Sequence, residues 1–83
     1  MYIATEIKRT CGHNPQQEEF SVVSEDPEKL KDFFRNRFSK VCSYIPWKEN
    51  AAHYNKWESM FSYKIWRQEI EVLIIIEKIG FIK

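Results

Sequence analysis

Residues 70–79 read IEVLIIIEKI, with five apolar residues together from Val72 to Ile76. Isoleucine and valine dominate this stretch, and β-branched residues favour strands over helices because a helical turn restricts their side chains. Two glutamates and a lysine interrupt the stretch, so it is too short and too charged to span a membrane. We predict that it is the central strand of a small sheet. One face would carry Ile70, Val72, Ile74 and Ile76, and the other would carry Leu73 and Ile75.

Two stretches near the start of the chain also alternate between apolar and polar residues. Residues 2–10 place Ile3, Thr5 and Ile7 on one face, and residues 19–24 resume the pattern. Between them, residues 11–17 read CGHNPQQ, in which glycine, asparagine and proline favour a turn. These residues predict a hairpin with a long connection.

A helix is predicted next, because Asp26 suits an N-cap, Pro27 suits the first helical position and Glu28 complements the helix dipole. At 100° per residue, one apolar arc gathers Leu30, Phe33, Phe34, Phe38 and Val41. We expect this helix to end near residue 42 or 43, ahead of Pro46.

Residues 44–56 carry no regular pattern, and residues 57–66 alternate with a period of two, which favours a strand. The alternative is a second helix at about residues 51–64, because several aromatic residues there also fit a helical spacing. Residues 67–69 would form the last turn. The predicted fold class is α+β: one domain over residues 1–83, with about four antiparallel strands and one main helix in ββαββ order. The order would be ββααβ if the second helix forms.

Composition excludes several classes of protein. The formal net charge is +1, from 13 basic and 12 acidic residues, so the chain lacks the overall charge of a nucleic-acid-binding protein. The first ten residues lack the apolar core of a signal peptide, and two cysteines are too few for a disulfide framework. We therefore expect a cytoplasmic protein with reduced cysteines and no membrane association.

The sequence holds few residues in the patterns that catalytic or metal-binding sites require. A tetrahedral metal site would need Cys11, His13, Cys42 and His53, but their spacing matches no common zinc motif. A cysteine nucleophile is supported only by the presence of Cys11 and His13 in one predicted turn. A small ribonuclease-type toxin is an alternative, and its candidate catalytic residues would be His53, Tyr63, Lys64 and Arg67. We expect a non-catalytic protein with no cofactor and no metal.

Basic residues gather on the predicted helix, which supports RNA or DNA binding as a second alternative. Its candidate contacts are Lys29, Lys31, Arg35 and Lys40. On a helical wheel, however, the charges of this stretch divide between the two flanks of the apolar arc. Arg37 projects into the arc, where it needs a carboxylate, and the plausible partners are Glu6, Glu71 and Glu77.

The residues Leu73 and Ile75 raise the main functional question. One helix covers one face of a sheet, and an uncovered face should be polar. Either residues 44–56 cover Leu73 and Ile75, using Tyr44, Ile45, Trp47 and Tyr54, or another chain does, which makes a homodimer through this face one possibility. Edge strands offer a further docking route by strand addition.

The leading hypothesis is a small protein-binding module, acting as an inhibitor that occludes a host protein or nucleoprotein complex. Aromatic residues make up 16% of the chain, and Trp and Tyr commonly anchor interfaces. The candidate contacts are Trp47, Tyr54, Trp57 and Trp66, with Glu18, Glu19, Glu25 and Asp26 as a possible mimic of phosphate charge. In size and composition alone, the chain resembles small accessory proteins of phages and mobile elements, among them anti-CRISPR proteins.

Overall fold

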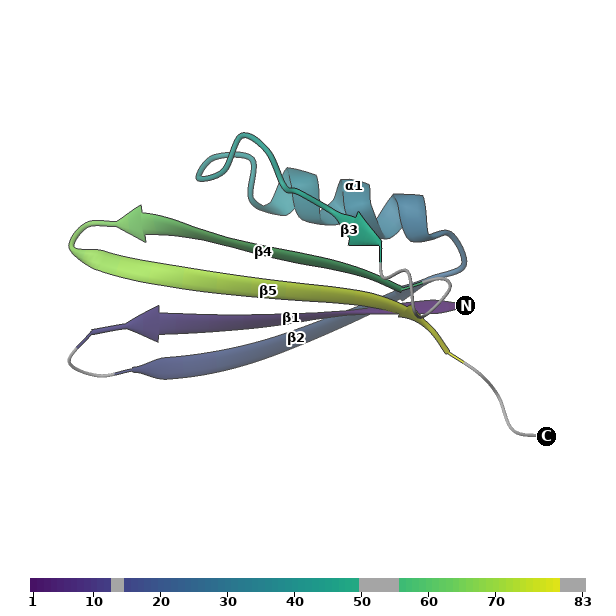
Figure 1. The fold of residues 1–83 in the computed structure, drawn as a ribbon, viewed down its shortest axis with the longest axis horizontal. Coiled ribbons are helices and arrows are strands. Elements are labelled where there is room, and N and C mark those ends of the chain that lie inside the picture. Colours follow the sequence, from purple (N-terminus) through teal and green to yellow (C-terminus); the bar gives the residue numbers. More distant parts are fainter. Residues whose placement is uncertain (13–14, 50–55, 80–83) are drawn as a thin grey trace.

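The computed structural model describes residues 1–12, 15–49 and 56–79, which form an α+β fold (Figure 1). The elements in chain order are β1 (Tyr2–Cys11), β2 (Gln16–Ser24), α1 (Pro27–Arg37), β3 (Lys48–Glu49), β4 (Lys56–Ile65) and β5 (Gln68–Lys78). The strands form one antiparallel sheet in the order β2-β1-β5-β4-β3. The predicted central position of the last strand is therefore confirmed. The predicted ββαββ order lacked β3, a two-residue strand at the edge.

The strand register separates the side chains of the sheet into two faces. Ala4 lies opposite Ile76, and Glu6 lies opposite Ile74, which also faces Ser59 on β4. We call this side the covered face, because its central members are all buried: Ala4, Glu6, Ser59, Val72, Ile74 and Ile76. The alternate side chains form what we call the open face, whose apolar members are Ile3, Ile7, Val23, Met60, Leu73 and Ile75.

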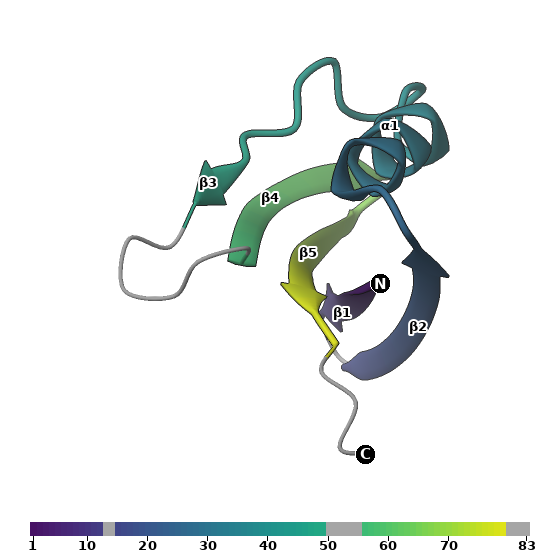
Figure 2. The same ribbon diagram turned by 90° about the vertical axis from the view of Figure 1, so that its right-hand side faces the viewer.

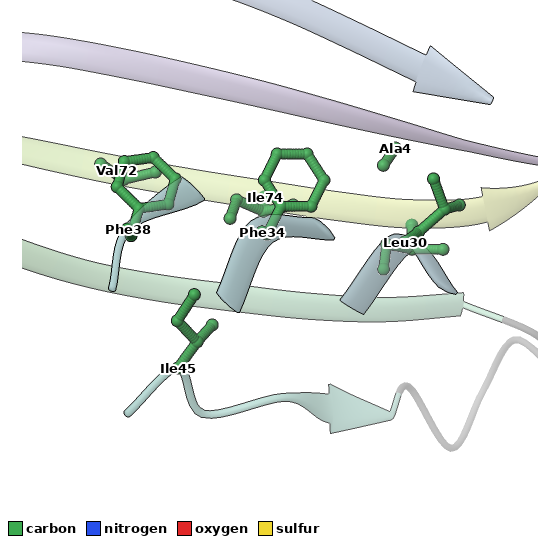
Figure 3. Packing of buried hydrophobic residues seen from close by; sticks show 8 residues of the cluster. Ala4, Leu30, Phe34, Phe38, Ile45, Val72 and Ile74 are labelled. Atoms are coloured by element: carbon green, nitrogen blue, oxygen red, sulfur yellow. The ribbon is translucent and has the colours of Figure 1, made fainter. Parts of the chain in front are cut away.

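Helix α1 lies against the covered face. Leu30, Phe34 and Phe38 recur every fourth position, so they project from one side of the helix and its C-cap. Figure 3 shows these three side chains over the central strands, where all three are buried. This packing confirms the predicted apolar arc in its centre, whereas Phe33 and Val41 at its margins remain exposed.

The two ends of α1 differ in how well they were predicted. The Asp26 side chain caps the first turn as expected, accepting a hydrogen bond from the Glu28 N–H at 2.9 Å. The helix ends at Arg37, five or six residues before the predicted end. At the new end, the Ser39 hydroxyl donates to the Asn36 carbonyl at 3.0 Å, a local bond that competes with helix continuation.

The connection from α1 to β3 lies on the helix side of the sheet (Figure 2). Ile45 is buried in the same core as Phe34, and Trp47 packs against that core. Residues 44–49 therefore do not cover Leu73 and Ile75, contrary to one of the two alternatives. Tyr44 is 74% exposed, and Tyr54 lies outside the described residues.

Strand β4 decides between the two predictions for the second half of the chain. Residues 56–65 are a strand, so the alternative helix at 51–64 and the ββααβ order are wrong over the described part of that range. Trp57, Phe61 and Tyr63 pack against the core, as the alternation predicted. The last turn was predicted at residues 67–69, but it begins one residue earlier and ends two residues earlier. Ile65 pairs with Gln68, so the turn is Trp66-Arg67.

Candidate protein-binding surfaces

The turn between β4 and β5 presents a tryptophan to solvent. Trp66 is 97% exposed, although it is one of the largest apolar side chains in the chain. Its backbone has φ of 61°, and among the described residues no other non-glycine residue has a positive φ. Two-residue hairpin turns of this kind normally place glycine or asparagine at such a position, because a Cβ atom is strained there. The chain thus holds a strained, fully exposed tryptophan at the end of its longest hairpin.

The neighbours of Trp66 give the turn a mixed character. Ile65 is also among the exposed large apolar residues, and Lys64 and Arg67 are exposed. Residues 64–67, the end of β4 and the turn, therefore combine two apolar side chains with two positive charges, and we call them the hairpin tip. Trp and Arg are the residues most enriched among the contacts that dominate binding energy at protein interfaces.

Two of the other predicted aromatic contacts, Trp47 and Trp57, pack against the core instead of lying beside Trp66, and Tyr54 lies outside the described residues. Trp57 packs against the core, with its ring centroid 6.0 Å from that of Tyr2, and the Lys31 ammonium lies 4.7 Å above it. Trp47 also packs inward, and among the described residues its buried Nε1 has no hydrogen-bond partner. Their aromatic area stabilises the core, and among the described members of the predicted set Trp66 is the fully exposed one.

The structure also separates the predicted acidic set. Glu18 and Glu19 are adjacent in β2, so their side chains point to opposite faces of the sheet. Glu25 and Asp26 lie beyond the other end of that strand, about 20 Å away at the usual rise per residue. Asp26 is also engaged as the helix cap. These four residues do not combine into one negatively charged patch.

The basic helix offers few free charges. The Lys31 Nζ lies 3.0 Å from Glu28, and an Arg35 guanidinium nitrogen lies 3.1 Å from Asp32. Lys29 is exposed on α1, and Lys40 lies beyond the helix end. Two of the four predicted nucleic-acid contacts are thus partly neutralised by carboxylates within one helical turn.

Arg37 forms the ion pair that the sequence suggested, with the buried Glu6 as its partner. The Arg37 Nε donates to Glu6 Oε1 at 2.9 Å, and Nη2 donates to Oε2 at 3.3 Å. The guanidinium carbon also lies 4.5 Å from the ring centroid of Phe20. Hydrogen bonding to Glu6 raises the pKa of Arg37 despite the opposing effect of burial. This pair is a structural element, and Glu6 is 2% exposed beneath the helix.

Of the predicted catalytic residues, the structure describes Tyr63, Lys64 and Arg67. Tyr63 and Lys64 are adjacent in β4 and project from opposite faces, and His13 and His53 lie outside the described residues. Burial, followed by the charges of Glu71 and Glu69, raises the pKa of the Cys11 thiol, which disfavours the thiolate.

The part of the chain that the structure describes has no group of three or more Cys, His, Asp or Glu side chains placed to hold a metal ion. No helix in that part is long and apolar enough to cross a membrane.

The open face provides a second candidate surface. Met60 is 72% exposed and Val23 is 56% exposed, while Ile3, Ile7, Leu73 and Ile75 are partly exposed. A shallow groove of about 570 Å³ crosses this face toward the hairpin tip. Most of its lining belongs to the open face, and the full lining is Ile7, Arg9, Gln17, Met60, Phe61, Ser62, Glu71, Val72 and Leu73. The residues Arg9 and Glu71 give one end of this apolar surface a pair of opposite charges.

Sequence reasoning located the open face but missed the hairpin tip. The open face follows from alternation in residues 70–79, whereas the exposure of Trp66 depends on where the turn falls. The stretch IWRQE contains no glycine or asparagine that would mark the turn, so its position could not be deduced. Comparison of the chain with protein-family models, curated proteins and solved structures finds no match.

Proposed function

We propose that this chain is a small non-catalytic protein-binding module that inserts Trp66 into an apolar pocket of another protein. The observation that supports this function best is the combination of 97% exposure and positive φ at Trp66. By covering the partner around that pocket, the domain would act by steric occlusion, as an inhibitor does.

The strained backbone at Trp66 lowers the stability of the isolated domain. A non-glycine residue at positive φ is destabilised by about 1–2 kcal/mol relative to a relaxed conformation. An exposed indole does not recover that free energy through packing within this chain. Strained residues of this kind are typical of binding and catalytic positions, where the surrounding structure enforces the conformation.

The charges of the hairpin tip indicate the chemistry of the partner. Lys64 and Arg67 flank the two apolar residues, so a complementary pocket should be apolar at its centre and acidic at its rim. Truncation of a tryptophan at the centre of such an interface typically weakens binding by more than about 2 kcal/mol.

The test uses the purified chain as an affinity bait in an extract of the cells that produce it. Wild type is compared with Trp66→Gly, which relieves the backbone strain and removes the indole. Tyr44→Ala is the matched control, because Tyr44 is an exposed aromatic residue that does not belong to the hairpin tip. We expect wild type and Tyr44→Ala to retain the same partner and Trp66→Gly to lose it.

The stability of Trp66→Gly provides the second measurement. We expect urea denaturation to show that this variant is as stable as wild type or up to about 1 kcal/mol more stable. A clear loss of stability would show that Trp66 serves the fold. Equal retention of the partner by all three baits, or recovery of nuclease-sensitive RNA or DNA in its place, would also contradict the proposal.

A further inference from the structure

We propose that the open face is the interface of a homodimer, in which two sheets stack face to face. The two-fold axis runs along the strands, midway between β1 and β5. This inference concerns a different surface from the hairpin tip and does not depend on the function proposed above.

The centre of the open face is apolar. Ile7 lies opposite Leu73, and Thr5 lies opposite Ile75, so aliphatic side chains occupy the middle of both central strands. Met60 extends this surface onto β4, beside Leu73. The helix and the following connection lie on the other side of the sheet (Figure 2), so the described residues supply no cover. The aliphatic centre is typical of a sheet that packs against a second sheet, and charged residues flank it on the outer strands, with Glu19 on β2 and Glu58 on β4.

One cross-strand pair of charges on this face complements its own copy. Arg9 and Glu71 are cross-strand neighbours on β1 and β5, and neither belongs to an ion pair among the described residues. Rotation about the proposed axis exchanges the positions of β1 and β5. Arg9 then faces the partner's Glu71, and Glu71 faces the partner's Arg9. The four charges alternate in sign around a square, which satisfies the self-complementarity that a two-fold interface requires.

The same register opposes a two-fold axis at right angles to the strands. That axis would exchange the two ends of β5 and place Glu77 opposite the partner's Glu71, a contact between like charges. With the proposed axis, Glu77 faces the partner's Ile3 at the end of the interface, where the carboxylate can remain in water. The charge pattern therefore selects one of the two simple ways to stack the sheets.

The size of the face indicates a weak dimer. Four strands at about 4.8 Å spacing and seven residues at about 3.4 Å rise define roughly 450 Å² on each sheet. Two such faces bury about 900–1,000 Å², near the lower limit for specific interfaces. We therefore expect a dimer that dissociates on dilution.

The test is sedimentation analysis of the whole chain over a wide concentration range, with charge-reversal variants. Arg9→Glu makes all four charges negative, and Glu71→Arg makes them all positive. We expect each variant alone to dimerise at least tenfold more weakly than wild type. An equimolar mixture of the two should restore dimerisation as a heterodimer, because each negative pair then faces a positive pair. This rescue distinguishes a lost contact from a damaged fold.

A matched control and a second measurement locate the interface. Lys29→Glu makes the same change of charge on the exposed side of α1 and should leave dimerisation unchanged. In methyl NMR spectra, raising the concentration should shift the signals of Ile7, Leu73 and Ile75. The signals of Ile74 and Ile76, which point to the covered face, should stay in place.

Three results would overturn the proposal. The first is a wild-type chain that remains monomeric at the highest concentration. The second is dimerisation that persists unchanged in Arg9→Glu and Glu71→Arg, which would place the interface elsewhere. The third is a mixture of the two variants that stays monomeric while each variant is folded; the open face would then serve a different protein.

Discussion

Leu73 and Ile74 are neighbours in β5, yet they occupy different environments. Ile74 is fully buried beneath α1, whereas Leu73 lies on the open face with solvent access. Both faces of this strand are apolar, so the sequence alone does not say which one the domain covers itself. A strand with two apolar faces must be covered on both sides, and here the described residues cover only one.

The two faces also differ in where they place charge. The covered face buries Glu6 and neutralises it with the two hydrogen bonds from Arg37. The open face keeps Arg9 and Glu71 toward one end, beside the aliphatic centre. A charge beneath a helix must be paired within the chain, whereas a charge on an uncovered face remains available to a second molecule.

The largest expected effect comes from truncating the two neighbours in turn. Ile74→Ala leaves a cavity in the core and should lower the free energy of unfolding by about 3–4 kcal/mol. Leu73→Ala removes a side chain that is only partly buried, so the loss should be about 1 kcal/mol. Urea denaturation at low protein concentration, where the chain is monomeric, measures both values. Equal losses would show that the two faces are not different in the way described.

The second-largest loss of stability is expected from breaking the ion pair of the covered face. Arg37→Met leaves the Glu6 carboxylate buried without a partner and should cost about 2–3 kcal/mol. The value is below that of a fully buried pair because the Arg37 side chain is 36% exposed. The double variant with Glu6→Leu should recover most of the loss, since both charges are then absent. A double variant as unstable as Arg37→Met would indicate that shape, rather than charge, determines this contact.

The smallest effect is a pH dependence at the end of the covered face. Burial, followed by the charge of Glu6, raises the pKa of Tyr63, so the folded chain holds this proton more tightly than the unfolded chain does. The resulting stability is fully present below the unfolded pKa of about 10 and is lost as pH rises through the folded pKa. Urea midpoints on either side of this range should fall less in Tyr63→Phe than in wild type. Parallel profiles would contradict the assignment.

Local patterns predicted most of the secondary structure. The Asp26 cap, the apolar spacing in α1, the alternation in β1 and β4, and the two faces of β5 depend on residues close together in the chain. The central place of β5 also followed, because a strand that is apolar on both sides is disfavoured at an edge. The partner of Arg37 was narrowed to three carboxylates, and the register selected Glu6.

The features that were missed depend on tertiary contacts or on uncommon turn chemistry. The helix ends at Arg37, where Ser39 bonds the Asn36 carbonyl, and the following residues fold back so that Ile45 is buried in the core, a contact that the sequence pattern did not indicate. The turn at Trp66 uses residues that hairpins normally avoid at these positions. Trp57, a predicted partner contact, packs against the core in the register of the sheet, and the binding role of the predicted aromatic residues stays a prediction.

The strand order has a consequence for how this protein folds. β1 is near the start of the chain, but one of its two neighbours in the sheet is β5, whose residues 68–78 are synthesised some sixty residues later. Pairings between distant segments require costly loop closure and form slowly. Until β5 is made, the hairpin of β1 and β2 exposes a strand edge and an unfilled apolar face. The nascent chain is therefore most vulnerable to aggregation just before its central strand appears.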